Sequence, residues 1–101
     1  MKMLMFVRFS HKAFNAAVRD GSAGAKTKAI LEAIQPESVY FMEMNGRRTA
    51  AILVDLAKPS MIPALAEPWF LNFDADVEIH PVMSPEELEQ AGLDQLGEKW
   101  G

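Results

Sequence analysis

The chain has 101 residues, half of them hydrophobic, a formal net charge of −4 and no cysteine, which predicts a single domain over residues 1–101 with a modest core. The missing cysteines exclude disulfides, thiolate catalysis and thiolate metal sites, and the lack of a basic cluster argues against nucleic-acid binding. No apolar run approaches the roughly 20 residues that span a bilayer, and the start does not resemble a signal peptide, so we expect a cytoplasmic protein without a membrane partner.

The first predicted strand is residues 2–9, where apolar side chains alternate onto both faces. A strand that is apolar on both faces is typical of the centre of a sheet. Ser10 is suited to cap a helix after this strand, and Phe14 and Val18 begin a helical apolar pattern.

The helical pattern then loses its phase. A second apolar set in residues 30–34 lies nearly opposite to the first around a helix of 3.6 residues per turn. Residues 21–24 lie between the two sets and contain two glycines, which weaken a helix. We therefore expect a break there and a second helix from about 25 to 34, which ends before Pro36.

Residues 37–56 predict a β-hairpin around Asn45 and Gly46, because this pair tolerates the positive φ angles of a tight turn. The turn predicts six facing pairs: Val39 with Ile52, Phe41 with Ala50, Glu43 with Arg48, Tyr40 with Ala51, Met42 with Thr49, and Met44 with Arg47. Arg48 then has Glu43 as a local partner. Both faces of the hairpin are largely apolar away from the turn, so each needs a cover.

A helix is expected to start at residues 58–60 and to be limited by Pro68. The fourth strand is predicted for residues 75–82, with apolar and polar side chains alternating. Ser84, followed by a proline and two glutamates, is typical of a helix N-terminus. We expect the tail after this short helix to be loose as far as Gly101, apart from Trp100.

The predicted order is strand, helix, strand, strand, helix, strand and an extra helix, which matches the ferredoxin-like split βαβ motif. The expected fold class is therefore α+β, with an antiparallel four-stranded sheet. Right-handed crossovers place both main helices on one sheet face. The other face is apolar as well, so we expect a second copy to cover it and the chain to be its own partner in a homodimer.

Five stretches carry a resemblance to a known family: residues 18–24, 36–41, 45–48, 62–71 and 76–83. Through them the chain resembles the dimeric α/β-barrel superfamily, in which two ferredoxin-like protomers pack sheet against sheet. More narrowly, it is similar to a group of small, poorly characterised bacterial proteins, over nearly the whole chain. The superfamily includes cofactor-free monooxygenases, lactone isomerases, haem-degrading enzymes and ligand-sensing domains. The resemblance thus implies a fold and a dimer but no single reaction.

Asp76, Glu78 and His80 share one face of the last predicted strand, about 6.5–7 Å apart along it. Such side chains either bind a metal or let the histidine act as a base oriented by a carboxylate. The commoner alternative is the polar face of a strand at a rim or dimer seam. Tyr40 either donates its hydroxyl into a cavity or simply packs.

The catalytic candidates are thus His80, Glu78 and Tyr40. Zinc usually needs more histidine or some cysteine, so we name no metal and expect no cofactor.

Three further residues are candidates for binding a ligand. His11 either faces the mouth of a pocket or is a solvated residue of a first helical turn. Arg47 either holds an anion or a partner's carboxylate, or is solvated beside the turn, and Trp69 either stacks on a flat ligand or seals the helix layer. Arg8 and Asp55 are also expected to pair, on the assumption that their strands are parallel neighbours.

Two functions remain open from the sequence. The first is a homodimeric small-molecule-binding or structural module without an assignable reaction, because no nucleophile and base lie close together in the sequence. The second is a cofactor-free monooxygenase or isomerase that acts on a small apolar or aromatic molecule, as the resemblance implies. A regulatory interaction protein is a weaker third. A closed apolar cavity at His80 favours the enzyme, whereas exposure of His80 to solvent or to a seam favours the module.

Overall fold

The computed structural model describes the whole chain, residues 1–101. The strands are β1 (Lys2–Arg8), β2 (Ser38–Met44), β3 (Arg47–Asp55) and β4 (Asp76–Pro81). The helices are α1 (His11–Asp20), α2 (Ala23–Ile34), α3 (Ile62–Phe73), α4 (Pro85–Gln90) and α5 (Leu93–Trp100), with a short 3-10 helix, η1 (Pro59–Met61), before α3. None of these helices has both the length and the apolar character needed to cross a bilayer.

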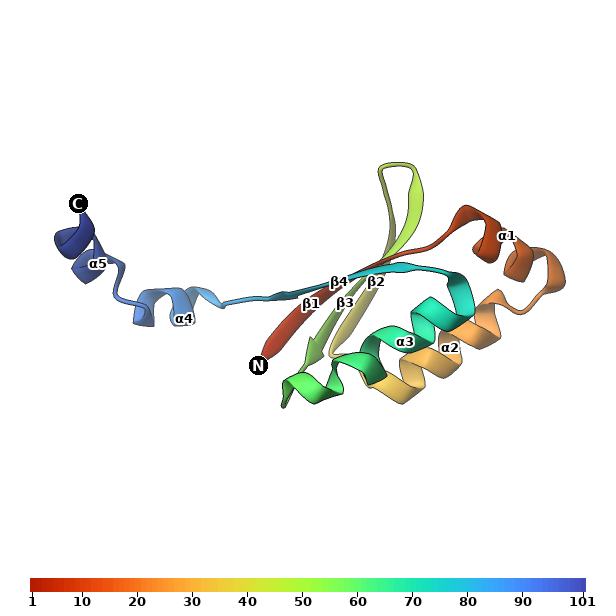
Figure 1. The fold of residues 1–101 in the computed structure, drawn as a ribbon, viewed down its shortest axis with the longest axis horizontal. Helices are drawn as coiled ribbons and strands as arrows, with labels where there is room; N and C mark the ends of the chain where they lie inside the picture. Colours follow the sequence, from red (N-terminus) through yellow and green to blue (C-terminus); the bar gives the residue numbers. More distant parts are fainter.

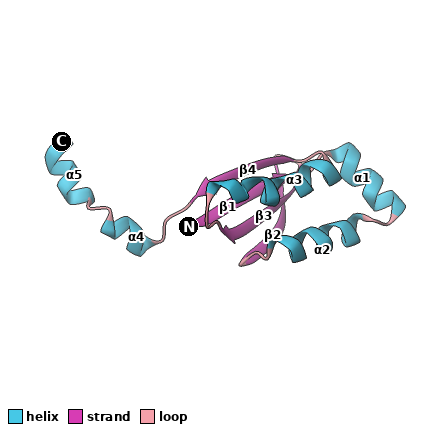
Figure 2. Ribbon diagram, turned by 60° about the horizontal axis from the view of Figure 1, so that its bottom comes forward, coloured by secondary structure: helices cyan, strands magenta, loops and turns pink.

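The four strands form one antiparallel sheet in the spatial order β2-β3-β1-β4, which is the ferredoxin-like arrangement of an α+β fold. Helices α2 and α3 lie together on one face of the sheet, and α1 lies beyond one of its ends (Figures 1 and 2). The predicted fold class is therefore confirmed. The chain adds a second helix before β2 and a second helix after β4.

The break between α1 and α2 is confirmed, and capping residues define the ends of the two helices. Ser10 caps α1, since its Oγ accepts from the N–H of Ala13 at 3.3 Å. Gly21 ends α1 in the left-handed region, at φ +81°, a conformation that costs glycine little. Gln35 ends α2 in the same region, directly before Pro36.

The β2–β3 hairpin has the predicted register, and all six facing pairs are confirmed. Asn45 and Gly46 form its turn with φ angles of +54° and +79°. The ion pair predicted within the hairpin is wrong. Glu43 accepts instead from the N–H of Gly46 at 2.9 Å, and Arg48 donates to Asn15 of α1 at 2.7 Å. Each charged side chain thus has a nearer partner than the residue opposite it.

Helix α3 continues past Pro68 to Phe73, so the expectation that this proline limits the helix is wrong. Proline removes one backbone N–H, which leaves the carbonyl of Ala64 without its helical partner. Ala64 is exposed, so water can satisfy that carbonyl. The opposite side of α3 buries Leu65 and Trp69, and this apolar packing stabilises the helix on both sides of the proline.

The core lies between the sheet and its helices. Its buried residues include Met3, Met5, Val7, Phe9, Ala50, Ile52, Val54, Leu65, Trp69 and Phe73. Phe9 is the centre of an aromatic cluster, with edge-to-face contacts to Trp69 and Phe73 at centroid distances of 5.8 and 5.2 Å. The odd-numbered residues of β1 therefore face the helices, and the even-numbered ones face away.

Residues 82–101 form an arm that extends away from the sheet and makes the molecule 59 Å long (Figure 1). A capping box starts α4: Ser84 Oγ accepts from the N–H of Glu87 at 3.1 Å, and the Glu87 carboxylate accepts from the N–H of Ser84 at 3.0 Å. These hydrogen bonds, that from the Ser84 backbone above all, lower the pKa of Glu87. The tail expected to be loose is in fact the helix α5, in which apolar residues recur at helical spacing.

Candidate functional site

The side of the sheet that faces away from α2 and α3, here called the open face, is apolar over three strands. Its apolar residues are Leu4, Phe6, Tyr40, Met42, Met44, Ala51 and Leu53. None of them is buried, whereas the alternating residues of β1 and β3 on the helix side form the core. An apolar surface drawn from three adjacent strands is the kind that a partner covers.

The polar border of the open face comes from β4, where Asp76, Glu78 and His80 share one side of the strand as predicted. Nε2 of His80 lies 3.2 Å from Oε2 of Glu78, and the His80 ring meets Phe6 of β1 edge-on at a centroid distance of 6.0 Å. A carboxylate thus contacts the imidazole, in the geometry that orients a histidine base. Asp76, Glu78 and His80 do not form a group able to hold a metal ion.

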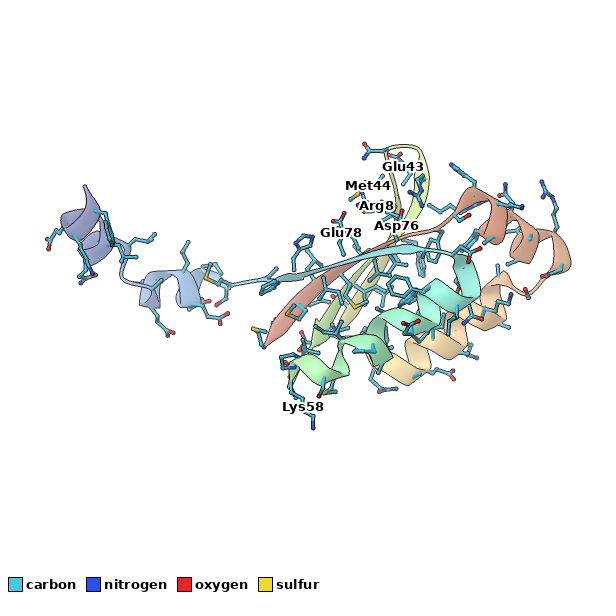
Figure 3. The ribbon with its side chains drawn as sticks, in the orientation of Figure 1. Arg8, Glu43, Met44, Lys58, Asp76 and Glu78 are labelled. Atoms are coloured by element: carbon cyan, nitrogen blue, oxygen red, sulfur yellow. The ribbon has the colours of Figure 1, made fainter.

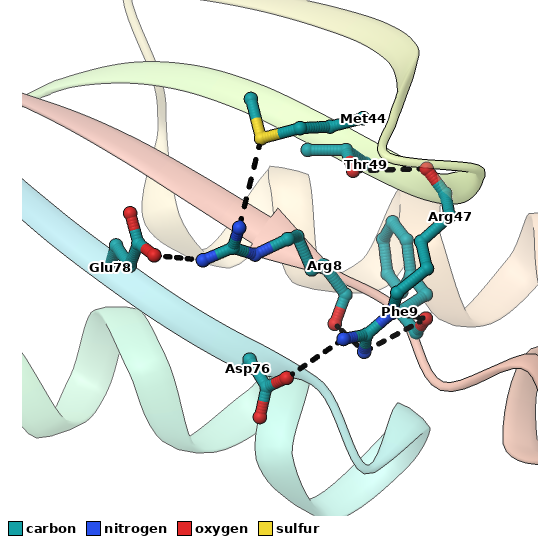
Figure 4. A network of polar contacts seen from close by, with 7 residues as sticks. All are labelled: Arg8, Phe9, Met44, Arg47, Thr49, Asp76 and Glu78. Atoms are coloured by element: carbon teal, nitrogen blue, oxygen red, sulfur yellow. Dashed lines mark hydrogen bonds and ion pairs between the residues drawn. The ribbon is translucent and has the colours of Figure 1, made fainter.

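Arg8 connects this polar border to the apolar part of the open face. Its Nη2 forms an ion pair with Glu78, and its Nη1 lies 3.9 Å from Sδ of Met44 in the hairpin (Figure 4). Figure 3 shows Arg8, Met44 and Glu78 together on the side of the sheet away from α2 and α3. Thr49, opposite Arg8 in the ladder, is buried in the middle of this group.

Arg47 closes the end of the sheet beside this group. Its guanidinium donates to the carbonyl oxygens of Arg8 and Phe9 at 3.3 Å, and to Oδ2 of Asp76 at 3.0 Å (Figure 4). These contacts join the hairpin to the last residues of β1 and the first residue of β4. The donors of Arg47 are thus used within the chain, which makes it a positioning residue for Arg8 and Asp76.

The other candidates lie apart from the Arg8 group. Tyr40 is an exposed residue of the open face in the same cross-strand row as Glu78, but two strands separate them, which is about 14 Å. His11 is exposed at the first residue of α1 and has no hydrogen-bond or ion-pair partner. Trp69 is completely buried against Phe9, so its ring seals the helix layer and presents no surface to a ligand.

The predicted pairing of Arg8 with Asp55 is wrong. Strands β1 and β3 are antiparallel, so Arg8 faces Thr49, and Asp55 lies at the far end of the ladder. Asp55 accepts instead from the amino group of Met1 at 2.8 Å, which lowers the pKa of its carboxyl. The predicted ferredoxin-like order contained the missing signal, because it makes β1 antiparallel to both neighbours and brings Arg8 to the carboxylates of β4.

The structure has two hollows, and neither includes a residue of the open face. One of about 450 Å³ lies between α4 and α5, and one of about 440 Å³ lies between α2 and α3. A comparison with models of known protein families found no match for this chain, and a comparison with curated proteins found none either.

Proposed function

We propose that the chain is a homodimeric small-molecule-binding module of the dimeric α/β-barrel superfamily, in which two open faces pack against each other. The open face itself carries the proposal. It has an apolar centre and a polar border that contains Asp76, Glu78 and His80, which is the anatomy of a protein–protein interface. A stable homodimer of this kind buries more than about 1,000 Å² in total.

The space between two such faces would suit a small apolar or aromatic molecule. Phe6, Met42 and Met44 offer apolar and adaptable contacts. Arg8 and Glu78 add a few fixed polar groups among them, already oriented by their ion pair. Binding sites for small organic molecules combine these features: an apolar lining with a small number of polar groups that converge on one place.

A cofactor-free monooxygenase or isomerase is the second candidate, and the contact between His80 and Glu78 favours it. In that function His80 takes a proton from the substrate while Glu78 holds the imidazole. The binding module is preferred because His80 is exposed at the border of the open face and lines no cavity of the chain. Tyr40 is separated from β4 by two strands, which is too far for it to share a substrate atom with His80 in one protomer.

Replacing His80 by alanine should weaken the binding of small aromatic molecules more than ten-fold. The reason is that the change removes both the imidazole and its contact with Glu78 at the border of the site. The measurement is an NMR titration of the labelled protein with a set of small aromatic compounds, followed through the backbone signals of β1 and β4. His11→Ala is the matched control, since His11 is the only other histidine and lies apart from the open face.

Unchanged affinity in His80→Ala would remove this residue from the site. If the compounds instead shift signals in the groove between α2 and α3, the open face is not the binding site. Turnover of a bound compound that is lost in His80→Ala but kept in His11→Ala would favour the enzyme over the binding module.

A further inference from the structure

The C-terminal arm, residues 82–101, presents an apolar face that nothing in its own chain covers. Leu93, Leu96 and Trp100 recur at positions i, i+3 and i+7 of α5 and so share one side of the helix. All three are exposed, and Trp100 keeps 77% of its surface. A short helix is marginal in water unless its apolar face packs against something. The face of α5 therefore requires a surface to cover it.

The start of the arm directs it away from its own body. The N–H of Val82 still donates to the carbonyl of Lys2 at 3.2 Å, so the ladder of β4 continues to this residue. Ser84 already begins the capping box of α4, and only Met83 lies between the two fixed points. In Figure 1 the arm continues the line of β4 to the end of the molecule opposite α1. A surface on another molecule is therefore better placed to cover α5 than the body of the same chain.

The groove between α2 and α3 has the complementary chemistry. It is lined by Ala25, Lys26, Ala29, Ile30, Ala33, Pro68 and Asn72. Most of these residues are apolar, and Lys26 is the one charged residue of the lining. The arm has five carboxylate side chains and one lysine, whereas residues 1–81 have equal numbers of acidic and basic side chains. An acidic arm with an apolar stripe thus matches an apolar groove whose one charged lining residue is Lys26.

We infer that the arm of each protomer docks in the α2–α3 groove of a second copy of this chain, with Leu93, Leu96 and Trp100 facing the groove. A two-fold dimer then fills two grooves with two arms, because the same pair of surfaces is used twice. The inference rests on the proposed association of two copies of this chain, but it does not require their sheets to pack against each other. It assigns a role to α5 that the open face does not require.

The test uses the cysteine-free background of the chain. A full-length variant that carries Leu96→Cys and Ala29→Cys should form intermolecular disulfides under mild oxidation. Non-reducing electrophoresis should then show a covalent dimer, and mass spectrometry of the digest should join the α5 peptide to the α2 peptide. The control carries Glu98→Cys with Ala29→Cys, because Glu98 lies on the polar side of α5. It should cross-link at least ten-fold more slowly.

Each outcome decides between the two interfaces. A link that forms within one chain, or one that forms no faster than in the control, would overturn arm exchange. If the wild-type protein is nonetheless a dimer, these results would not contradict the proposed contact between the sheets. Cross-linking that survives the addition of Met42→Asp on the open face would show that arm exchange does not depend on the sheet contact.

Discussion

Replacing Met42 by aspartate is expected to raise the dissociation constant of the dimer by about a hundred-fold or more. Met42 lies on the open face, so in the proposed dimer the new carboxylate would be buried among apolar side chains without a partner. An unpaired buried charge costs about 3 kcal/mol or more, which corresponds to that change in affinity. Size-exclusion chromatography with light scattering, over a dilution series, measures the shift from dimer to monomer. Ala51→Asp on β3 should act in the same way.

Phe41→Asp is the matched control, because Phe41 is the next residue of β2 and points to the other side of the sheet. In the single chain Phe41 is 58% exposed and Met42 is 39% exposed. Both side chains are thus exposed, so neither substitution is expected to unfold the single chain. The two variants differ mainly in the face that carries the charge. Dissociation of Phe41→Asp together with an intact Met42→Asp dimer would show that the opposite face forms the interface.

Replacing Trp69 by alanine should lower the free energy of unfolding by about 3–5 kcal/mol, the usual loss when a large aromatic is removed from a core. Trp69 is 0% exposed and packs on Phe9 and Phe73 between α3 and the sheet. A domain of this size has a total stability of about 5–15 kcal/mol, so the variant should be close to unfolding at room temperature. Urea denaturation followed by circular dichroism, at one fixed protein concentration, measures the loss.

Leu71→Ala, on the same helix, is the control for this substitution. Leu71 is 80% exposed, so its truncation should change the free energy of unfolding by less than about 0.5 kcal/mol. Equal losses for the two variants would contradict the assignment of Trp69 to the core. A stable Trp69→Ala protein would reopen the interpretation of this residue as part of a ligand site.

Most of the fold was predictable because local residues decide it. Asn45 and Gly46 are the residues that a two-residue hairpin turn favours, and with the turn in place the pairing of the whole hairpin follows. Gly21 ends α1 in the left-handed region, which costs other residues more free energy than glycine, so the break between α1 and α2 could be predicted as well. The alternation in β4 placed Glu78 and His80 on one face.

The rest depends on contacts between distant residues. Pro68 signals a helix end locally, but burial of Trp69 beside it keeps α3 intact. The sequence alone did not show that Arg8 meets Glu78, because that contact requires the antiparallel neighbours of β1 to be assigned correctly. Helical spacing of apolar residues was present in residues 93–100, but this segment is too short for the pattern to distinguish a helix from a loose tail.

The central claim is that the chain is a homodimer that buries its open face. Sedimentation equilibrium of the wild-type protein at micromolar concentration tests it most directly. The account predicts a single folded species of twice the 11.2 kDa mass of the chain, with no monomer until the protein is diluted well below that range. A stable, folded monomer at micromolar concentration would contradict it.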